Sequence, residues 1–220
     1  MNDESLSETS IWNPEIAYAV GLIVADGSLS KDGRHIDFTS KDLVLVKIFQ
    51  RCLEKEYCKI GTKQSGSSNS IYYRLQFGDK KFYDWLISIG IKANKSKCVA
   101  EVSIPELYFF DFLRGVFDGD GTIYVSRDKR WKSAETKVMG FASGSMDFLI
   151  WLQNKLKVSL NTTGFITNGS RVLQLLYGKS DATKIATAMY VEATSPRLER
   201  KFAKIQKILR IDERHTARVP

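Results

Sequence analysis

Two stretches of the chain repeat one pattern, and this repeat constrains the fold more than any other feature. Residues 14–27 open with Pro-Glu, continue as an apolar run and close with Asp-Gly, and residues 105–121 do the same. Proline suits the first turn of a helix, so both stretches are predicted to be helices. The first should end near Ala25, with Gly27 as its C-terminal glycine, and the second near Asp118. Both are apolar nearly all round, which is typical of helices buried between layers.

The segments after the two helices match as well. Each copy continues with two strands, a helix that begins after FTS or FAS, two more strands and a final helix. The two copies are offset by 94 residues at the acidic motif (26 to 120) and by 103 at FTS/FAS (38 to 141). We therefore predict an α+β fold of two αββαββα half-domains related by a pseudo-two-fold axis. The expected strands cover residues 29–30, 35–39, 59–64, 71–77, 122–128, 138–143, 159–167 and 171–177.

The repeat also divides the chain. We expect a disordered arm at residues 1–10, an N-terminal half-domain at 11–100, a C-terminal half-domain at 101–211 and a basic tail at 212–220. Two halves related in this way suit a partner that itself has approximate two-fold symmetry. Duplex DNA is the obvious candidate.

Charge and composition narrow the class of protein. The net charge is +8, from 33 Lys and Arg against 25 Asp and Glu, which favours a polyanionic partner. No apolar run reaches 18 residues, so we expect no membrane span, and the acidic, polar N-terminus does not resemble a signal peptide. We expect an intracellular protein, in the cytoplasm or an organelle matrix. The three cysteines lack CxxC spacing, which predicts reduced thiols and no zinc site.

Only two histidines are present, so carboxylates must carry any metal or acid–base chemistry. Asp26 and Asp120 end the two predicted helices, where the helix dipole places partial negative charge, and a carboxylate there calls for a cation. With the carbonyls of Ala25 and Gly119, they offer the hard oxygen ligands that Mg²⁺ prefers. A lone Asp-Gly at a helix end is usually just a turn, but its recurrence at matching points favours function. The counterpart of Asp118 in the first motif is Val24, so we do not assign Asp118 a role common to both motifs.

Small residues recur at a spacing of four within each helix, at Gly21 and Ala25 and at Gly115 and Gly119. Such residues let two helix backbones approach closely. If the two helices pack side by side, their terminal acids come together. Two metal sites near one phosphodiester can activate water and stabilise the leaving oxygen.

The motifs AVGLIVADG at 19–27 and LRGVFDGDG at 113–121 resemble the two motifs of the LAGLIDADG homing endonucleases. The resemblance extends from Pro14 to Lys201. It implies a single-chain pseudo-dimer whose motif helices form the interface and whose antiparallel sheets form a DNA-binding saddle. It also implies that Asp26 and Asp120 bind the catalytic divalent metals. This chain departs from the motif at Val24 and at Arg114, and Arg114 requires a partner or an edge location.

The resemblance further implies that the protein cuts both strands of a long, pseudo-palindromic site and leaves short 3′ overhangs. We expect Mg²⁺ as cofactor, Mn²⁺ as a substitute, and Ca²⁺ to support binding without efficient cleavage. Homing endonucleases are commonly encoded in introns or inteins, and no intein splicing blocks are evident. We expect a monomer that needs no protein partner. The alternative is a catalytically silent DNA or RNA binder, such as an intron maturase or a transcription regulator, on the same scaffold.

Strand alternation separates a predicted DNA face from a core face that holds Leu29, Ile60, Leu75, Ile123 and Val125. Arg74, Gln76 and Gln174 are the best candidates for base contacts, because Arg and Gln can bond two atoms of a base edge. The loop at residues 127–132 is the densest basic–aromatic cluster. The predicted DNA-binding residues are Ser28, Ser30, Arg34, Lys59, Lys63, Tyr72, Arg74, Gln76, Thr122, Tyr124, Ser126, Arg127, Lys129, Arg130, Lys132, Lys137, Arg171 and Gln174.

The family also carries basic residues near each scissile phosphate. The matching stretches are NKSKC at 94–98 and PRLERK at 196–201, so the resemblance makes Lys95, Lys97 and Lys201 catalytic candidates. Ser40 with Lys41, and Ser143, end matching strands and are weaker candidates for contact with metal-bound water.

Overall fold

A computed structural model describes residues 11–64, 70–92, 99–127, 135–169, 172–190 and 195–209. The first half contains α1 (Pro14–Asp26), β1 (Gly27–Leu29), β2 (His35–Ser40), α2 (Leu43–Cys52), β3 (Ile60–Gln64), β4 (Ile71–Gly78) and α3 (Lys80–Ser88). The second half contains a 3₁₀ turn (Glu106–Tyr108), α4 (Phe109–Asp120), β5 (Gly121–Arg127), β6 (Glu135–Ser143), α5 (Met146–Leu160), β7 (Phe165–Asn168), β8 (Leu173–Tyr177), α6 (Lys179–Met189) and α7 (Glu199–Leu209). No helix in these ranges is long and apolar enough to cross a membrane.

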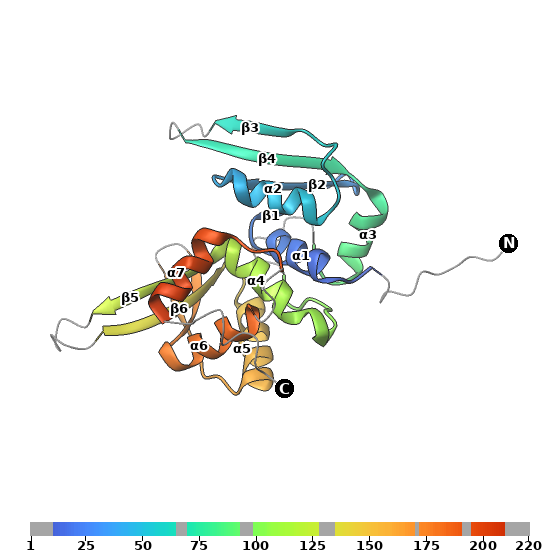
Figure 1. The fold of residues 1–220 in the computed structure, drawn as a ribbon. Coiled ribbons are helices and arrows are strands. Elements are labelled where there is room, and N and C mark those ends of the chain that lie inside the picture. The colour runs from blue at the N-terminus through green and yellow to red at the C-terminus, as the bar shows by residue number, and fades with distance from the viewer. Residues whose placement is uncertain are drawn as a thin grey trace.

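Each half contains one antiparallel four-stranded sheet, and the two sheets have the same strand order. The orders are β1-β2-β4-β3 and β5-β6-β8-β7. The apolar sides of the central strands are buried, for example Phe38 opposite Leu75 and Phe141 opposite Leu175. The β3–β4 and β5–β6 hairpins extend to the same side of the α1–α4 pair (Figure 1). The predicted α+β fold of two αββαββα halves is confirmed.

Helices α1 and α4 pack against each other at the centre of the molecule, and glycine makes their contact possible (Figure 1). A Cβ added at Gly21 would lie 2.1 Å from the carbonyl oxygen of Phe112. A Cβ added at Gly115 would lie 2.1 Å from the carbonyl oxygen of Tyr18. The close approach predicted from the spacing of small residues is confirmed.

The start of α1 agrees with the prediction, but the helix ends differ from it. Asn13 caps α1, with its side-chain oxygen accepting a hydrogen bond from the Ile16 amide at 2.7 Å. Gly27 is not a left-handed C-terminal glycine, because its φ is −79° and it is already the first residue of β1. Glycine is needed there for space, since a Cβ would lie 2.7 Å from the Ile23 Cα. Helix α4 likewise runs to Asp120, two residues beyond the expected end, and enters β5 directly.

Two predictions about strands were wrong. Helix α5 continues to Leu160 and ends at Asn161, whose left-handed φ of 48° stops it, so β7 begins at Phe165 and not at residue 159. Val125, expected in the core, has 40% of its surface exposed. The buried pair Ile123–Met139 lies nearer the helices, whereas Val125 lies further out along the β5–β6 ribbon.

Helix α7 is an element that the repeat did not predict. It buries Phe202, Ile205 and Leu209 and packs against α6 and β5. Arg200, in its first turn, donates a 2.7 Å hydrogen bond to Asp42, which caps α2 of the first half. The helix therefore ties the C-terminal segment to both halves. Its spacing of apolar residues, at i, i+3 and i+7, is a helix signal that could have been read from the sequence.

Candidate functional site

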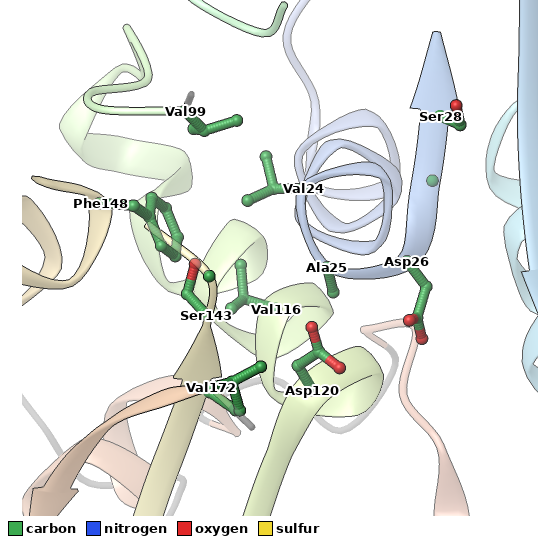
Figure 2. Close-up of a pocket in the computed structure, with 13 residues that line it drawn as sticks. Val24, Ala25, Asp26, Ser28, Val99, Val116, Asp120, Ser143, Phe148 and Val172 are labelled. Carbon is green, nitrogen blue, oxygen red and sulfur yellow. The ribbon is translucent and has the colours of Figure 1, made fainter. Parts of the chain in front are cut away.

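Asp26 and Asp120 lie at adjoining ends of α1 and α4, where Figure 2 shows their carboxylates next to each other. Both side chains are exposed and line one cavity, together with Ser28, Ser143 and Val172. The last turns of α1 and α4 point their partial negative charge at this cavity. The structure therefore brings the two predicted acids into one site between the halves.

Glycine at position 119 permits this meeting. A Cβ added there would lie 2.3 Å from the Ala25 Cβ and 3.8 Å from a carboxylate oxygen of Asp26. The last turn of α4 thus touches the last turn of α1. A larger residue at 119 would push the two acids apart.

The donor set suits a hard divalent cation. Its side-chain ligands are two carboxylates, since the described ranges contain no group of three or more His, Cys, Asp and Glu side chains that could hold a metal. Asp26 and Asp120 supply carboxylate oxygens, and water or substrate phosphate would complete an octahedral shell, as Mg²⁺ prefers. Of the two backbone carbonyls predicted as ligands, that of Gly119 accepts a hydrogen bond from Lys201 at 3.0 Å. The ammonium of Lys201 therefore already compensates part of the negative charge at this helix end.

Lys201 sits against the C-terminal end of α4. Its Nζ donates to three carbonyl oxygens, those of Phe117 at 2.7 Å, Gly119 at 3.0 Å and Gly121 at 2.8 Å. Burial lowers the pKa of Lys201 to about 8, although the carboxylates of Asp118, Asp120 and Asp26 act in the opposite direction. The structure thus places this predicted lysine beside both acids.

Two charged residues of α4 are buried behind the site. Asp118 accepts hydrogen bonds from the Tyr18 hydroxyl and the Leu198 amide, both at 2.7 Å, and burial raises its pKa to about 6. It faces the interior and not the cavity of the two acids. Of the two alternatives predicted for Arg114, a partner or an edge location, the structure shows the first: Arg114 is buried, donates to the carbonyls of Pro196 and Met189 and pairs with Asp111.

The first sheet presents most of its predicted DNA-binding residues on one face. Lys59, Lys63, Arg74 and Gln76 line a shallow groove together with Gly61 and Thr62. Thr62 was not predicted, and strand alternation gives no reason to predict it, because Thr62 pairs with Tyr73 on the face of the buried Leu75. Ser28 lies on this face opposite Asp37, and Tyr72 lies opposite Lys63. Ser30 and Arg34 flank the turn between β1 and β2.

Arg74 has a partner that sequence reasoning missed. Its Nε donates to the carboxylate of Asp37 on the neighbouring strand. Asp37 also accepts from the Thr39 hydroxyl at 3.0 Å. This pair fixes the guanidinium on the groove.

The second sheet divides its predicted residues between its two faces. Thr122, Tyr124 and Ser126 alternate on the face opposite the buried Ile123. Thr122 lies opposite Gly140, and Ala142, two residues further along β6, lies opposite Gln174. Gln174 is therefore on the same outer face. Lys137 is on the other face of the sheet, because it lies opposite Val125 and shares the face of Ile123 and Met139.

The two serines at strand ends have matching local roles. Ser40 Oγ accepts from the Asp42 amide at 3.2 Å, and Ser143 Oγ accepts from the Ser145 amide at 3.1 Å. Each organises the turn before a helix, and Ser143 also lines the cavity of the two acids. Lys41 lies over the ring of Tyr72, 5.1 Å from its centre. Other predicted residues lie outside the described ranges, namely Lys95, Lys97, Lys129, Arg130, Lys132 and Arg171, and for Arg127 only the backbone is described.

Comparison with known proteins supports the motif resemblance. Residues 13–90 match the model of the LAGLIDADG-like domain. No curated protein sequence matches the chain. Among solved structures, the chain is similar to the homing endonuclease I-WcaI bound to its DNA recognition sequence, with a TM-score of 0.63, 15% identity, and coverage of 95% of this chain and 94% of that one.

Two further structures show how widely the fold is used. The I-LtrWI LAGLIDADG homing endonuclease bound to target DNA gives a TM-score of 0.57 at 12% identity, over 90% of this chain and 91% of that one. Full-length DUF199/WhiA from Thermatoga maritima gives 0.58 at 16% identity, over 90% of this chain and 61% of that one. Residues 13–90 therefore form a LAGLIDADG-like domain, and the duplicated αββαββα architecture of the whole chain is the fold of the single-chain LAGLIDADG homing endonucleases.

Proposed function

We propose that this protein is a site-specific homing endonuclease that binds a long, pseudo-palindromic DNA duplex and hydrolyses both strands, leaving short 3′ overhangs. The observation that carries the proposal is the meeting of Asp26 and Asp120 in one cavity between two equivalent halves. The two strands of a duplex are themselves related by two-fold symmetry. Two acids at an axis of this kind can each serve one strand.

The residues present fit a divalent metal at this point. Bound Mg²⁺, or Mn²⁺ in its place, would supply Lewis-acid activation of water and charge stabilisation, and Ca²⁺ is expected to support binding only. Asp26 and Asp120 would hold the ions, and Lys201 would place positive charge next to the scissile phosphate. Both acids belong to one chain, which supports a monomer that needs no protein partner, and we propose that it acts inside the cell.

The outer faces of the sheets would contact the DNA. Basic and polar residues gather there, including the groove of Lys59, Lys63 and Gln76, and contacts of this kind bind phosphate and read base edges. The net charge of +8 favours such a polyanion.

The similarity to WhiA favours a second candidate, a DNA or RNA binder that does not cut. A fold by itself does not decide function. The paired acids support the nuclease, because a pure binder has no need of two carboxylates at adjoining helix ends.

Selection of cleaved sites from a randomised DNA library with Mg²⁺ would test the proposal. The expected result is recovery of one long pseudo-palindromic site with short 3′ overhangs. Enrichment of bound but uncut DNA would favour the second candidate.

Replacing Lys63 with alanine is expected to weaken DNA binding about equally for all sequences, because we assign its charge to a phosphate contact and not to a base contact. The slope of log affinity against log salt should fall by about 1. Titration of labelled duplex at several salt concentrations in Ca²⁺ gives both quantities. Lys80→Ala is the control, because Lys80 is exposed on α3 and pairs with Asp84. An unchanged salt slope for Lys63→Ala would remove this face from the proposed interface.

A further inference from the structure

The second motif helix carries charged side chains at two buried positions, one turn apart, where the first carries valine. Arg114 and Asp118 have only 2% and 1% of their surface exposed. At the offset of 94 residues, their counterparts in α1 are Val20 and Val24. Burying charge is costly unless hydrogen bonds compensate it, so the partners of these two residues show what they are for.

Both residues bond to backbone atoms at the end of α6 and in residues 196–198, which lead into α7. The Arg114 guanidinium donates to the carbonyls of Met189 and Pro196. The Asp118 carboxylate accepts the amide of Leu198 at 2.7 Å. One face of α4 therefore fixes the end of α6 and residues 196–198 at three backbone atoms.

Residues 196–198 lead directly into the first turn of α7, which carries Lys201. The amide of Lys201 donates to the carbonyl of Leu198 at 2.9 Å, so the position of Leu198 sets that of Lys201. The Lys201 ammonium in turn donates hydrogen bonds to the carbonyls of Phe117 and Gly119 at the end of α4. Asp118 also accepts from Tyr18 of α1, which links this arrangement to the first half.

We infer that Arg114 and Asp118 are positioning residues that hold Lys201 beside Asp120 and thereby set the rate at which one of the two strands is cut. The inference rests on the proposed nuclease function. Because valines occupy the matching positions of α1, the first half is not built with this clamp. The two strands should therefore respond differently when the clamp is removed.

The test uses a Tyr18→Phe background, which removes the hydroxyl that Asp118→Val would otherwise leave buried and unpaired. Removing both partners of a buried hydrogen bond costs far less than removing one. Tyr18→Phe alone keeps the bond from Asp118 to Leu198 and is the matched control. Adding Asp118→Val removes that bond and installs the residue that the first half carries.

The first readout is the cleavage rate of each strand, measured on a duplex labelled separately on both. Adding Asp118→Val should slow one strand by about a hundredfold, the size of effect that a small displacement of a catalytic group can have. Nicked DNA should accumulate. In a Lys201→Ala background, Asp118→Val should cause no further loss, because both changes act through the same ammonium. Equal slowing of both strands, or a full additional loss in that background, would contradict the inference.

The second readout needs no DNA. Acylation of lysines, followed by mass spectrometry, should show Lys201 protected in the wild type and in Tyr18→Phe. With Asp118→Val added, Lys201 labelling should approach that of exposed Lys80, while Lys80 itself is unchanged. Unchanged protection of Lys201 would overturn the positioning role even if the protein cuts no DNA. If the wild type cuts no DNA but adding Asp118→Val exposes Lys201 to acylation as expected, the nuclease proposal fails and the clamp stands as a structural feature.

Discussion

Replacing Asp26 or Asp120 with asparagine is expected to abolish DNA cleavage and to leave DNA affinity nearly unchanged. Asparagine keeps the size of the side chain but removes the charge that would hold a divalent ion in the shared cavity. Loss of metal-derived charge stabilisation amounts to several kcal/mol, so the rate should fall by about a thousandfold or more. Both side chains are exposed, so folding should not suffer. Conversion of supercoiled plasmid to linear DNA in Mg²⁺ gives the rate, and titration in Ca²⁺ gives the affinity.

Asp84→Asn is the control, because Asp84 is an exposed carboxylate on α3 that does not line the cavity. It should cut at the wild-type rate. An Asp26→Asn/Asp120→Asn double variant that still cuts at the wild-type rate would show that these acids hold no catalytic metal. Loss of binding together with cleavage would instead assign the acids a role in DNA contact.

The fold could be predicted because its main features are local and occur twice. The spacing of Gly21 and Gly115 within their helices already indicates a close helix pair, and strand alternation gives the buried faces of both sheets. Helix ends were harder to predict. Gly27 looks like a C-terminal glycine in the sequence, but the closeness of Ile23, and not a left-handed turn, requires glycine there.

The two acids of the candidate site could be predicted, but not the residues around them. The partners of Arg114 are carbonyls of Met189 and Pro196, and a carbonyl belongs to every residue, so no pattern of side chains marks them. The Arg74–Asp37 pair depends on the register between β2 and β4, which strand alternation alone does not fix. The features of the site that could not be predicted are therefore mostly contacts between segments that are distant in sequence.

Gly115→Ala is expected to lower the free energy of unfolding by about 3 kcal/mol or more, the upper range for overpacking a tight core. The new Cβ would lie 2.1 Å from the carbonyl oxygen of Tyr18 and 3.1 Å from the Cα of Gly21. Both neighbours are backbone atoms, which cannot rotate away as a side chain can. Alanine favours a helix over glycine by about 1 kcal/mol, so the observed loss would already include that gain.

Urea unfolding of Gly115→Ala and Gly61→Ala separates the packing of α1 on α4 from the general effect of replacing glycine. Gly61 lies in β3, and a Cβ there would meet nothing closer than the Arg74 carbonyl oxygen at 3.9 Å. Its substitution should leave stability unchanged or raise it slightly, since glycine within a strand is itself unfavourable. If Gly115→Ala were as stable as Gly61→Ala, the two helices could not be as close as the structure has them. The adjoining position of Asp26 and Asp120, which depends on that closeness, would then lose its support.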